Sequence, residues 1–295
     1  MTSRRSGVTS ARDLHFPDLV WSHFSRPRFG DFDERVAAAA AAGMQGIGLY
    51  VFEYERLRTE EGRSPADIRG VLDSNGIALA DVEVARGWWA TEGAEHEACQ
   101  RIEALAYEMA DEFGVRYLQA IGPYDCPFEQ AVERFAGLCD RAAAHGLLVG
   151  IEWLPYTNIA DAADAQAIVR AADRPNGGYC VDIWHHARGA NDITMIQALE
   201  PERVFSIQMN DGARVAVDPD YKADCLSNRV PPGEGEFDAA GFVRTLVAMG
   251  VDAPISLEVC STELWAVPAE LAAQRAADAM RRVLTAAGVD HGAQR

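Results

Sequence analysis

The sequence predicts an α/β protein of the (β/α)8 TIM-barrel class, folded as a single domain. Short apolar runs alternate with longer amphipathic runs along the chain of 295 residues, a pattern typical of parallel strands covered by helices. The alternation occurs eight times, and eight strand–helix units in about 270 residues match the size of such a barrel. A doubly wound open sheet is the structural alternative, but no G-x-G-x-x-G motif follows the first apolar run, which disfavours it.

The apolar runs give the expected strands in order. They span residues 19–24, 46–51, 79–86, 117–123, 148–154, 178–184, 204–211 and 254–259. Helical patterns lie between them, for example over residues 31–43, 64–76, 128–146 and 237–250. We expect Asp33 and Ser64 to cap the starts of two of these helices, and a glycine to close each of the four. The closing glycines are Gly43, Gly76, Gly146 and Gly250.

The barrel is expected to occupy residues 14–288 without an internal domain boundary. Residues 1–13 are polar and are expected to form an N-terminal tail, and residues 289–295 a C-terminal tail. The first residues lack the apolar segment of a signal peptide, and no run of about 18 apolar residues predicts a membrane span. The longest stretch without a clear pattern is 212–236. Long loops of this kind are usually functional lids or disordered segments.

The net charge and the cysteine spacing indicate which binding partners and which cellular compartment to expect. The formal net charge is −18, which disfavours binding to nucleic acid or to an anionic membrane. None of the six cysteines stand in a C-x-x-C spacing. A cytoplasmic protein without a disulfide framework or a structural zinc cluster is therefore expected.

Oxygen-bearing side chains end four consecutive predicted strands, from the fifth to the eighth. They are Glu152 in GIEWLP, Asp182 in VDIWHH, Gln208 in SIQMND and Glu258 in ISLEVC. Any one alone would more often be an ion-pair or capping group, but four at one height favour a shared site at the C-terminal end of the barrel. Converging buried carboxylates need a cation, and a divalent metal is the simplest one. His185, one turn after Asp182, is expected to lean toward this site, whereas His186 is expected to point away and be structural.

At these residues the chain resembles the xylose isomerase-like TIM barrel superfamily, also called the sugar phosphate isomerase/epimerase family, over nearly its whole length. The resemblance implies that Glu152, Asp182, Gln208 and Glu258 are the metal ligands. It also implies that His185 contacts substrate near the metal and that Arg214, in QMNDGAR, holds a substrate oxygen. A G-x-G-x-x-D segment of the family matches residues 233–238.

Gln208 stands where many members, including the ketose 3-epimerases, have histidine. At this position the chain is more similar to hydroxypyruvate isomerases and bacterial 3-dehydroshikimate dehydratases. An amide with three carboxylates gives an all-oxygen ligand set, which favours Mn²⁺ or Mg²⁺ over Zn²⁺ or Co²⁺. The apurinic-endonuclease branch needs further histidines, which the third and fourth strands lack.

A metal site of this kind suits a substrate with a ketone beside a hydroxyl. The metal acts as a Lewis acid on the carbonyl, and the glutamates at 152 and 258 flank the substrate, so that one removes the proton α to the carbonyl and the other returns it. The outcome is isomerisation or epimerisation of a keto-sugar or cyclic keto-polyol. The alternative, when a hydroxyl lies β to the carbonyl, is dehydration of a keto-polyol such as 3-dehydroshikimate or an inosose. A less favoured reading is a barrel that binds a ligand without catalysis.

The six tryptophans each fall at, or just past, the C-terminal end of a predicted strand. Either they pack strands against helices, or they line an aromatic mouth that suits a cyclic substrate. Trp88, Trp153 and Trp184 are the expected lining residues, with His23 from the end of the first strand. Lys222 and Arg229, in the 212–236 segment, are candidates to meet an anionic substrate group. The outer helices offer surfaces for a homo-oligomer.

Overall fold

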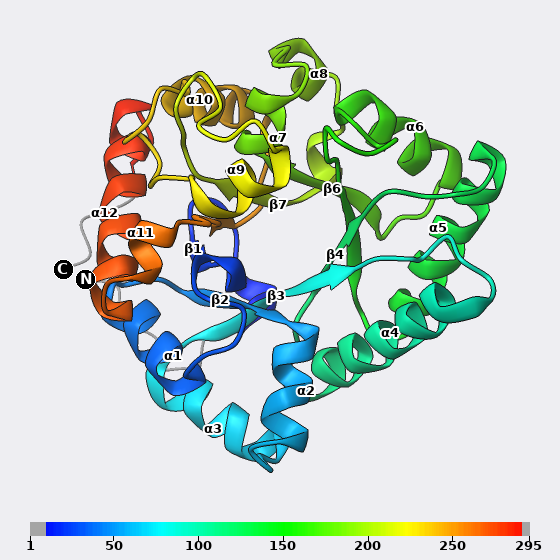
Figure 1. The fold of residues 1–295 in the computed structure, drawn as a ribbon, viewed down its shortest axis with the longest axis horizontal. Coiled ribbons are helices and arrows are strands. Elements are labelled where there is room, and N and C mark those ends of the chain that lie inside the picture. Colours follow the sequence, from blue (N-terminus) through cyan, green and yellow to red (C-terminus); the bar gives the residue numbers. More distant parts are fainter. Residues whose placement is uncertain (1–9, 291–295) are drawn as a thin grey trace.

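Eight parallel strands close into a barrel in the order in which they occur along the chain (Figure 1). The computed structural model describes residues 10–290. The strands are β1 (Leu19–Trp21), β2 (Gly46–Tyr50), β3 (Ala78–Ala85), β4 (Tyr117–Ile121), β5 (Leu148–Glu152), β6 (Gly177–Asp182), β7 (Val204–Met209) and β8 (Ile255–Leu257). Trp21 of β1 pairs with Ile47 of β2 on one side and with Leu257 of β8 on the other, which closes the barrel. The predicted (β/α)8 fold is confirmed.

Helices form a ring around the strands (Figure 1). They are α1 (Phe32–Ala41), α2 (Val51–Thr59), α3 (Pro65–Asn75), α4 (Gly93–Phe113), α5 (Phe128–Ala143), α6 (Ala162–Ala172), α7 (Ile183–Arg188), α8 (Ile193–Gln197), α9 (Tyr221–Ser227), α10 (Ala239–Met249), α11 (Thr262–Trp265) and α12 (Ala269–Ala286). The described part of the chain also has three short 3-10 helices, which are η1 (Ala11–Asp13), η2 (His23–Ser25) and η3 (Pro201–Arg203). None of the helices within residues 10–290 is both long and apolar enough to cross a membrane.

Burial follows from this two-layer arrangement. Every residue of β2 and of β6 is buried, because helices cover one face of each strand and the barrel interior covers the other. Helix α5 buries a stripe of residues at helical spacing, which includes Phe135, Leu138 and Ala142, and this stripe joins the core. The six cysteines are all free.

Capping side chains and a glycine mark the boundaries of helices α1 and α3. Ser64 and Asp67 form a capping box at the start of α3, and Gly76 closes that helix with a φ of 66°, a left-handed conformation that glycine adopts easily. The expectation that Asp33 caps α1 is wrong. The cap is Asp31, which accepts a hydrogen bond from the Glu34 N–H at 2.9 Å, and Asp33 lies within the first turn.

The sixth strand is shorter than predicted because Asp182 ends it. Its side chain accepts a hydrogen bond from the Trp184 N–H at 2.8 Å and so caps α7. The first strand likewise stops at Trp21, and the chain turns into η2 at His23. The strand-end residues thus leave the sheet directly into the loops at the C-terminal mouth of the barrel.

The segment 212–236, which carries no periodic pattern, is ordered by two aspartates. Asp211 accepts hydrogen bonds from the backbone N–H groups of Gly212, Gly233 and Phe237. Buried Asp224 accepts from the N–H groups of residues 217 and 218. Because Asp224 belongs to α9, its hydrogen bonds tie this helix to the loop before it.

The predicted tails lie mostly outside the described residues, which exclude 1–9 and 291–295. Within the expected N-terminal tail, Ala11 of η1 packs against a small apolar cluster that contains Leu14, Val20 and Ala80. The chain is therefore already attached to the base of the barrel before residue 14.

Candidate active site

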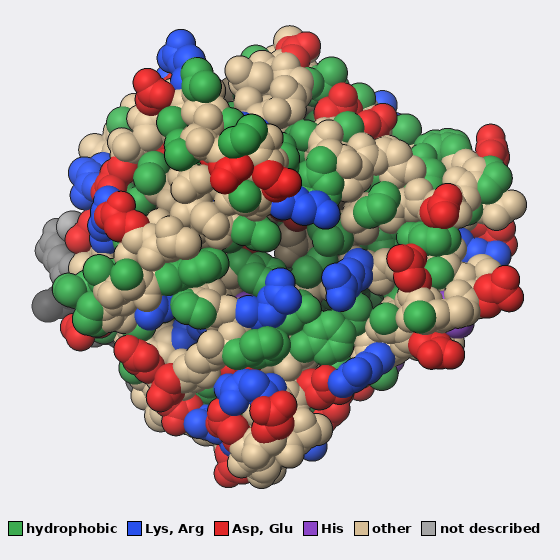
Figure 2. Space-filling model, viewed as in Figure 1, with side chains coloured by type: hydrophobic (Ala, Val, Ile, Leu, Met, Phe, Trp, Pro, Cys, Tyr) green, Lys and Arg blue, Asp and Glu red, His purple; other side chains and the backbone are tan. Residues whose placement is uncertain are grey.

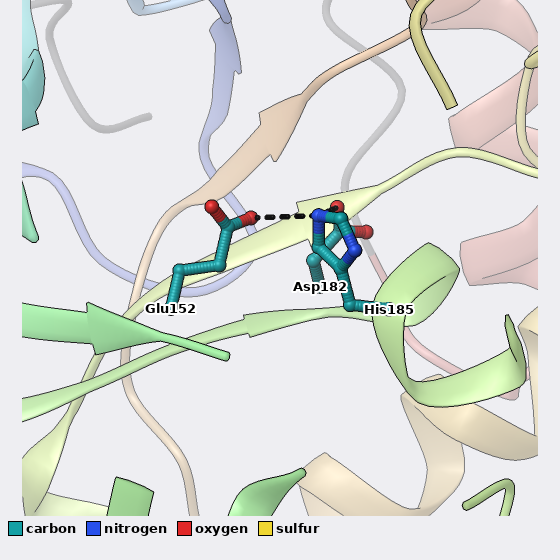
Figure 3. Close-up of side chains that lie close together, drawn as sticks. All are labelled: Glu152, Asp182 and His185. Carbon is teal, nitrogen blue, oxygen red and sulfur yellow. Dashed lines mark ion pairs between the residues drawn. The ribbon is translucent and has the colours of Figure 1, made fainter. Parts of the chain in front are cut away.

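Three buried side chains bring their polar atoms together at the C-terminal ends of β5 and β6 (Figure 3). Glu152 is the last residue of β5, Asp182 the last of β6, and His185 lies in the first turn of α7. The His185 Nε2 lies 3.4 Å from Glu152 Oε1 and 3.4 Å from Asp182 Oδ2. One ligand atom from each residue lies within 4.8 Å of the others. Two carboxylates and an imidazole in this arrangement can hold a divalent cation.

Gln208 and Glu258 complete the row of strand-end residues. Gln208 lies directly opposite Asp182 in the β6–β7 pairing, and Glu258 immediately follows β8. The Gln208 Nε2 is 3.4 Å from Glu258 Oε1, and Gln119 of β4 donates to Glu152 Oε2 at 2.7 Å. All four residues predicted as ligands therefore lie buried at the same end of the barrel.

The buried side chain of Arg229 reaches into this row from the segment after α9. Its Nη1 donates to Asp182 Oδ2 at 2.9 Å and to Glu258 Oε2 at 2.8 Å, and its Nε donates to the carbonyl of Cys225 at 2.9 Å. A paired guanidinium offsets part of the cost of burying two carboxylates. Burial nevertheless raises the pKa of Glu258 well above its usual range; Arg229 opposes this shift, and the charges of Glu152 and Asp182 add to it.

Buried oxygen atoms without hydrogen-bond partners at the strand ends indicate whether a cation fits this site. Glu152 Oε1, Gln208 Oε1 and Asn210 Oδ1 are buried and have no hydrogen-bond partner among residues 10–290. A buried polar atom without a partner costs about 1–3 kcal/mol. Carboxylate and amide oxygens are ligands that Mg²⁺, Mn²⁺ and Ca²⁺ accept, so the donors present fit a divalent metal.

A tyrosine from α9 fixes the imidazole. The His185 Nδ1 lies 2.7 Å from Tyr221 Oη. When Nδ1 carries the proton and donates to this hydroxyl, Nε2 is left with a lone pair directed at the carboxylates. The ring of Tyr221 lies 5.2 Å from that of Tyr156, which is 45% exposed. Tyr221 and Tyr156 therefore form an aromatic pair that leads from His185 to the surface.

The tryptophans expected to line the mouth are buried around the strand ends, and the Arg229 guanidinium lies 5.2 Å from the centre of the Trp184 ring, so this lining stays a prediction. Trp153 and Trp184 are buried, and the Trp184 ring packs against Phe237. The Trp88 Nε1 donates to the carbonyl of Ile121 at 2.9 Å, in a position between strand ends and α5. The ring nitrogens of His23 are bonded to the Arg28 carbonyl and to the Arg35 guanidinium.

Arg214 and His186 lie away from the cluster. Arg214 is exposed, and its backbone N–H donates to Glu236 at 2.7 Å. Both residues line a separate cavity of about 560 Å³ beside α10. Arg229, which follows Arg214 in the segment 212–236, is the arginine that contacts the strand-end carboxylates.

Sequence reasoning missed a second pair of carboxyl groups inside the barrel. Asp81 and Glu83 of β3 are both buried, and burial raises the pKa of Asp81 to about 7 and that of Glu83 to about 8. Ser22 Oγ lies 3.4 Å from Glu83 Oε2 and 3.5 Å from Glu258 Oε1, which links β3 to the site. The signal was the motif DVEV, in which acidic residues alternate with valines, so that the two acids share one face of a buried strand and the valines the other.

Curated proteins are similar to this chain in sequence. The chain is 30% identical over 263 residues to the 3-dehydroshikimate dehydratase of Pseudomonas aeruginosa, covering 86% of this chain and 40% of that protein. It thus spans less than half the length of this dehydratase. It is also 27% identical over 153 residues to the inosose isomerase of Bacillus subtilis, covering 50% of this chain and 52% of the relative.

Solved structures share the fold. The IOLI protein with a bound zinc atom superimposes with a TM-score of 0.80 at 19% identity, covering 91% of this chain and 98% of that one. A fusion of a xylose isomerase-like TIM barrel with 4-hydroxyphenylpyruvate dioxygenase gives 0.79 at 24% identity, covering 92% of this chain and 42% of that one. The family model described as xylose isomerase-like TIM barrel matches residues 36–283. The chain therefore belongs to the xylose isomerase-like TIM barrel family.

Proposed function

We propose that the chain is a divalent-metal-dependent enzyme that removes a proton α to the ketone of a cyclic keto-polyol, and that loss of water follows. The observation that carries this proposal is the buried row of strand-end residues in which Glu152 Oε1 and Gln208 Oε1 have no hydrogen-bond partner among the described residues. The sequence pattern placed isomerisation first and dehydration second. The relative named as a dehydratase matches far more of this chain than the inosose isomerase does, and this favours dehydration of 3-dehydroshikimate or a close analogue.

Glu152, Asp182 and His185 would hold the cation, with the Gln208 amide oxygen as a further ligand. When bound, the cation supplies Lewis-acid polarisation of the substrate carbonyl. The Tyr221 hydroxyl keeps the His185 ring oriented, and Arg229 keeps Asp182 and Glu258 in place. A carbonyl oxygen that enters between β5 and β7 would meet these groups together.

The two glutamates divide the proton transfers. Glu152, at the end of β5, accepts the proton from the carbon next to the carbonyl, and Glu258, after β8, delivers a proton from the other side. With 3-dehydroshikimate, the proton leaves carbon 4 and the hydroxyl leaves carbon 5. One water is released, and the ring tautomerises to 3,4-dihydroxybenzoate. Without a hydroxyl β to the carbonyl, the returned proton gives an isomer instead.

The test is turnover by protein reconstituted with Mn²⁺ or Mg²⁺. We expect 3-dehydroshikimate to give the ultraviolet absorbance of an aromatic product, and Glu152→Gln to abolish it. The second candidate, favoured by the similarity to inosose isomerases, predicts instead that proton NMR shows a new inosose isomer with every hydroxyl retained. Absence of turnover of either compound with every metal tried would refute the proposed function.

A further inference from the structure

Lys222 is the only lysine among the 27 lysine and arginine residues of the sequence. It lies in the first turn of α9, next to Tyr221, in the segment that covers the C-terminal mouth of the barrel (Figure 1). Every other lysine or arginine position of the chain is an arginine. The single lysine follows Tyr221, whose hydroxyl contacts His185 of the candidate site. No step proposed above uses it.

A continuous series of contacts joins the ammonium to the carboxylate cluster. His185 contacts Glu152 and Asp182 through Nε2, and Tyr221 through Nδ1. The Tyr221 ring packs on the Tyr156 ring, and the Lys222 Nζ lies 4.9 Å from the centre of that ring. The rings of Tyr221 and Tyr156 therefore lie between the Lys222 ammonium and the residues proposed to act on the substrate ketone.

The ammonium is not neutralised by the protein. Lys222 is exposed and forms no ion pair within residues 10–290, although acidic residues outnumber basic ones by 45 to 27. Arg28, after β1, instead stacks on Tyr50 at 5.4 Å, and Arg86 immediately follows β3 and is exposed. Figure 2 shows lysine and arginine side chains bordering the hollow at the centre of this face. The rim is thus basic on a protein of net charge −18.

We propose that Lys222 binds the carboxylate of the substrate and so selects an anionic cyclic keto-polyol over a neutral one. The proposal rests on the proposed function, because it takes the ketone end of the ring to lie at Glu152 and His185. Tyr221 and Tyr156 lie between the two ends of this series of contacts, and aromatic faces suit the C–H bonds of a ring. The flexible four-carbon stem of lysine places a compact positive charge over a range of positions, and an unpaired cation at a binding site favours an anionic ligand.

The single lysine makes a direct test possible. Reductive ¹³C-methylation of the Mg²⁺-loaded protein labels Lys222 and the N-terminal amine, and loss of one resonance in Lys222→Arg assigns the lysine signal. The probes are 3,4-dihydroxybenzoate and 3,4-dihydroxybenzamide, which have nearly the same shape and differ in charge. We expect the benzoate to shift the Lys222 resonance and the benzamide to leave it in place.

The second part of the test is the affinity of each variant for the benzoate and for the benzamide, measured by calorimetry. Wild type is expected to prefer the benzoate by about tenfold, the size of one charge-assisted hydrogen bond. Lys222→Met should lose this preference, and Lys222→Arg should keep most of it. Arg244→Met is the matched control, because it removes one exposed positive charge from α10 and should leave the preference unchanged.

The outcomes separate the two claims. Equal binding of both probes by wild type, no binding of either, or an unshifted Lys222 resonance overturns the role of Lys222. A preference that disappears in Lys222→Met, in a protein that turns over neither 3-dehydroshikimate nor an inosose, supports the anion site while refuting the proposed function.

Discussion

At the scale of single residues, the proposed metal ligands rest on two kinds of support: some lie together in the structure, and one is inferred from the family resemblance. His185 lies with Glu152 and Asp182 in one cluster, whereas Gln208 is a ligand by resemblance and by its unpaired Oε1. We expect His185→Ala and Gln208→Ala each to weaken Mn²⁺ binding by at least about tenfold, the range seen when groups that support a metal site are removed. Titration calorimetry measures this. Wild-type affinity in Gln208→Ala would show that the amide is not a ligand.

Arg229 is the residue whose removal should matter most for stability. Its guanidinium is the buried positive charge between Asp182 and Glu258. Arg229→Met should lower the free energy of unfolding by about 3–5 kcal/mol, because it leaves buried carboxylates without their partner. Urea unfolding monitors the loss, and added Mn²⁺ should restore more stability in the variant than in wild type. An unchanged urea midpoint would mean that the ion pairs contribute nothing.

At the scale of elements, the segment that carries α9 depends on carboxylates that bind backbone amides. Asp224 holds the N–H groups of Val217 and Asp218 and pairs with Arg188. Asp224→Ala should therefore speed amide hydrogen exchange across residues 213–228, while strand β6 keeps its protection. Mass spectrometry resolves the two peptides. Equal exchange in both proteins would show that other contacts hold α9.

The strands were predictable and this segment was not, for a physical reason. Apolar runs identify buried strands locally, and the topology then brings residues 152, 182, 208 and 258 to one end of the barrel. Asp211, by contrast, binds the N–H of Phe237, which is 26 residues away, and no periodicity records such a contact. The sequence indicated Arg229 as a candidate to meet an anionic substrate group, but its pairing with Asp182 and Glu258 required coordinates. The contact of Tyr221 with His185 required them as well. Most of the strands were predicted to run about two residues too far, as the ends of β4, β5, β7 and β8 show. The first and sixth strands end early because the η2 turn and Asp182 stop them.

At the scale of the whole molecule, the buried acids of β3 make stability depend on pH. The folded-state pKa of Asp81 is about 7, above the value near 3.9 of an unfolded chain. The folded state therefore holds a proton that the unfolded state releases, and stability falls as pH rises from about 4 to 7. Asp81→Asn cannot titrate, so its melting temperature should fall less over this range. Parallel melting curves for the two proteins would contradict this.

The central claim is that Glu152, Asp182, His185 and Gln208 bind one divalent cation at the C-terminal ends of β5, β6 and β7. The most direct measurement is an anomalous-scattering map from crystals of the protein grown with Mn²⁺. One peak is predicted at the C-terminal mouth of the barrel, about 2.0–2.6 Å from ligand atoms of Glu152, Asp182 and His185. A map with no peak there, from protein shown by elemental analysis to have been exposed to excess Mn²⁺, would contradict the account.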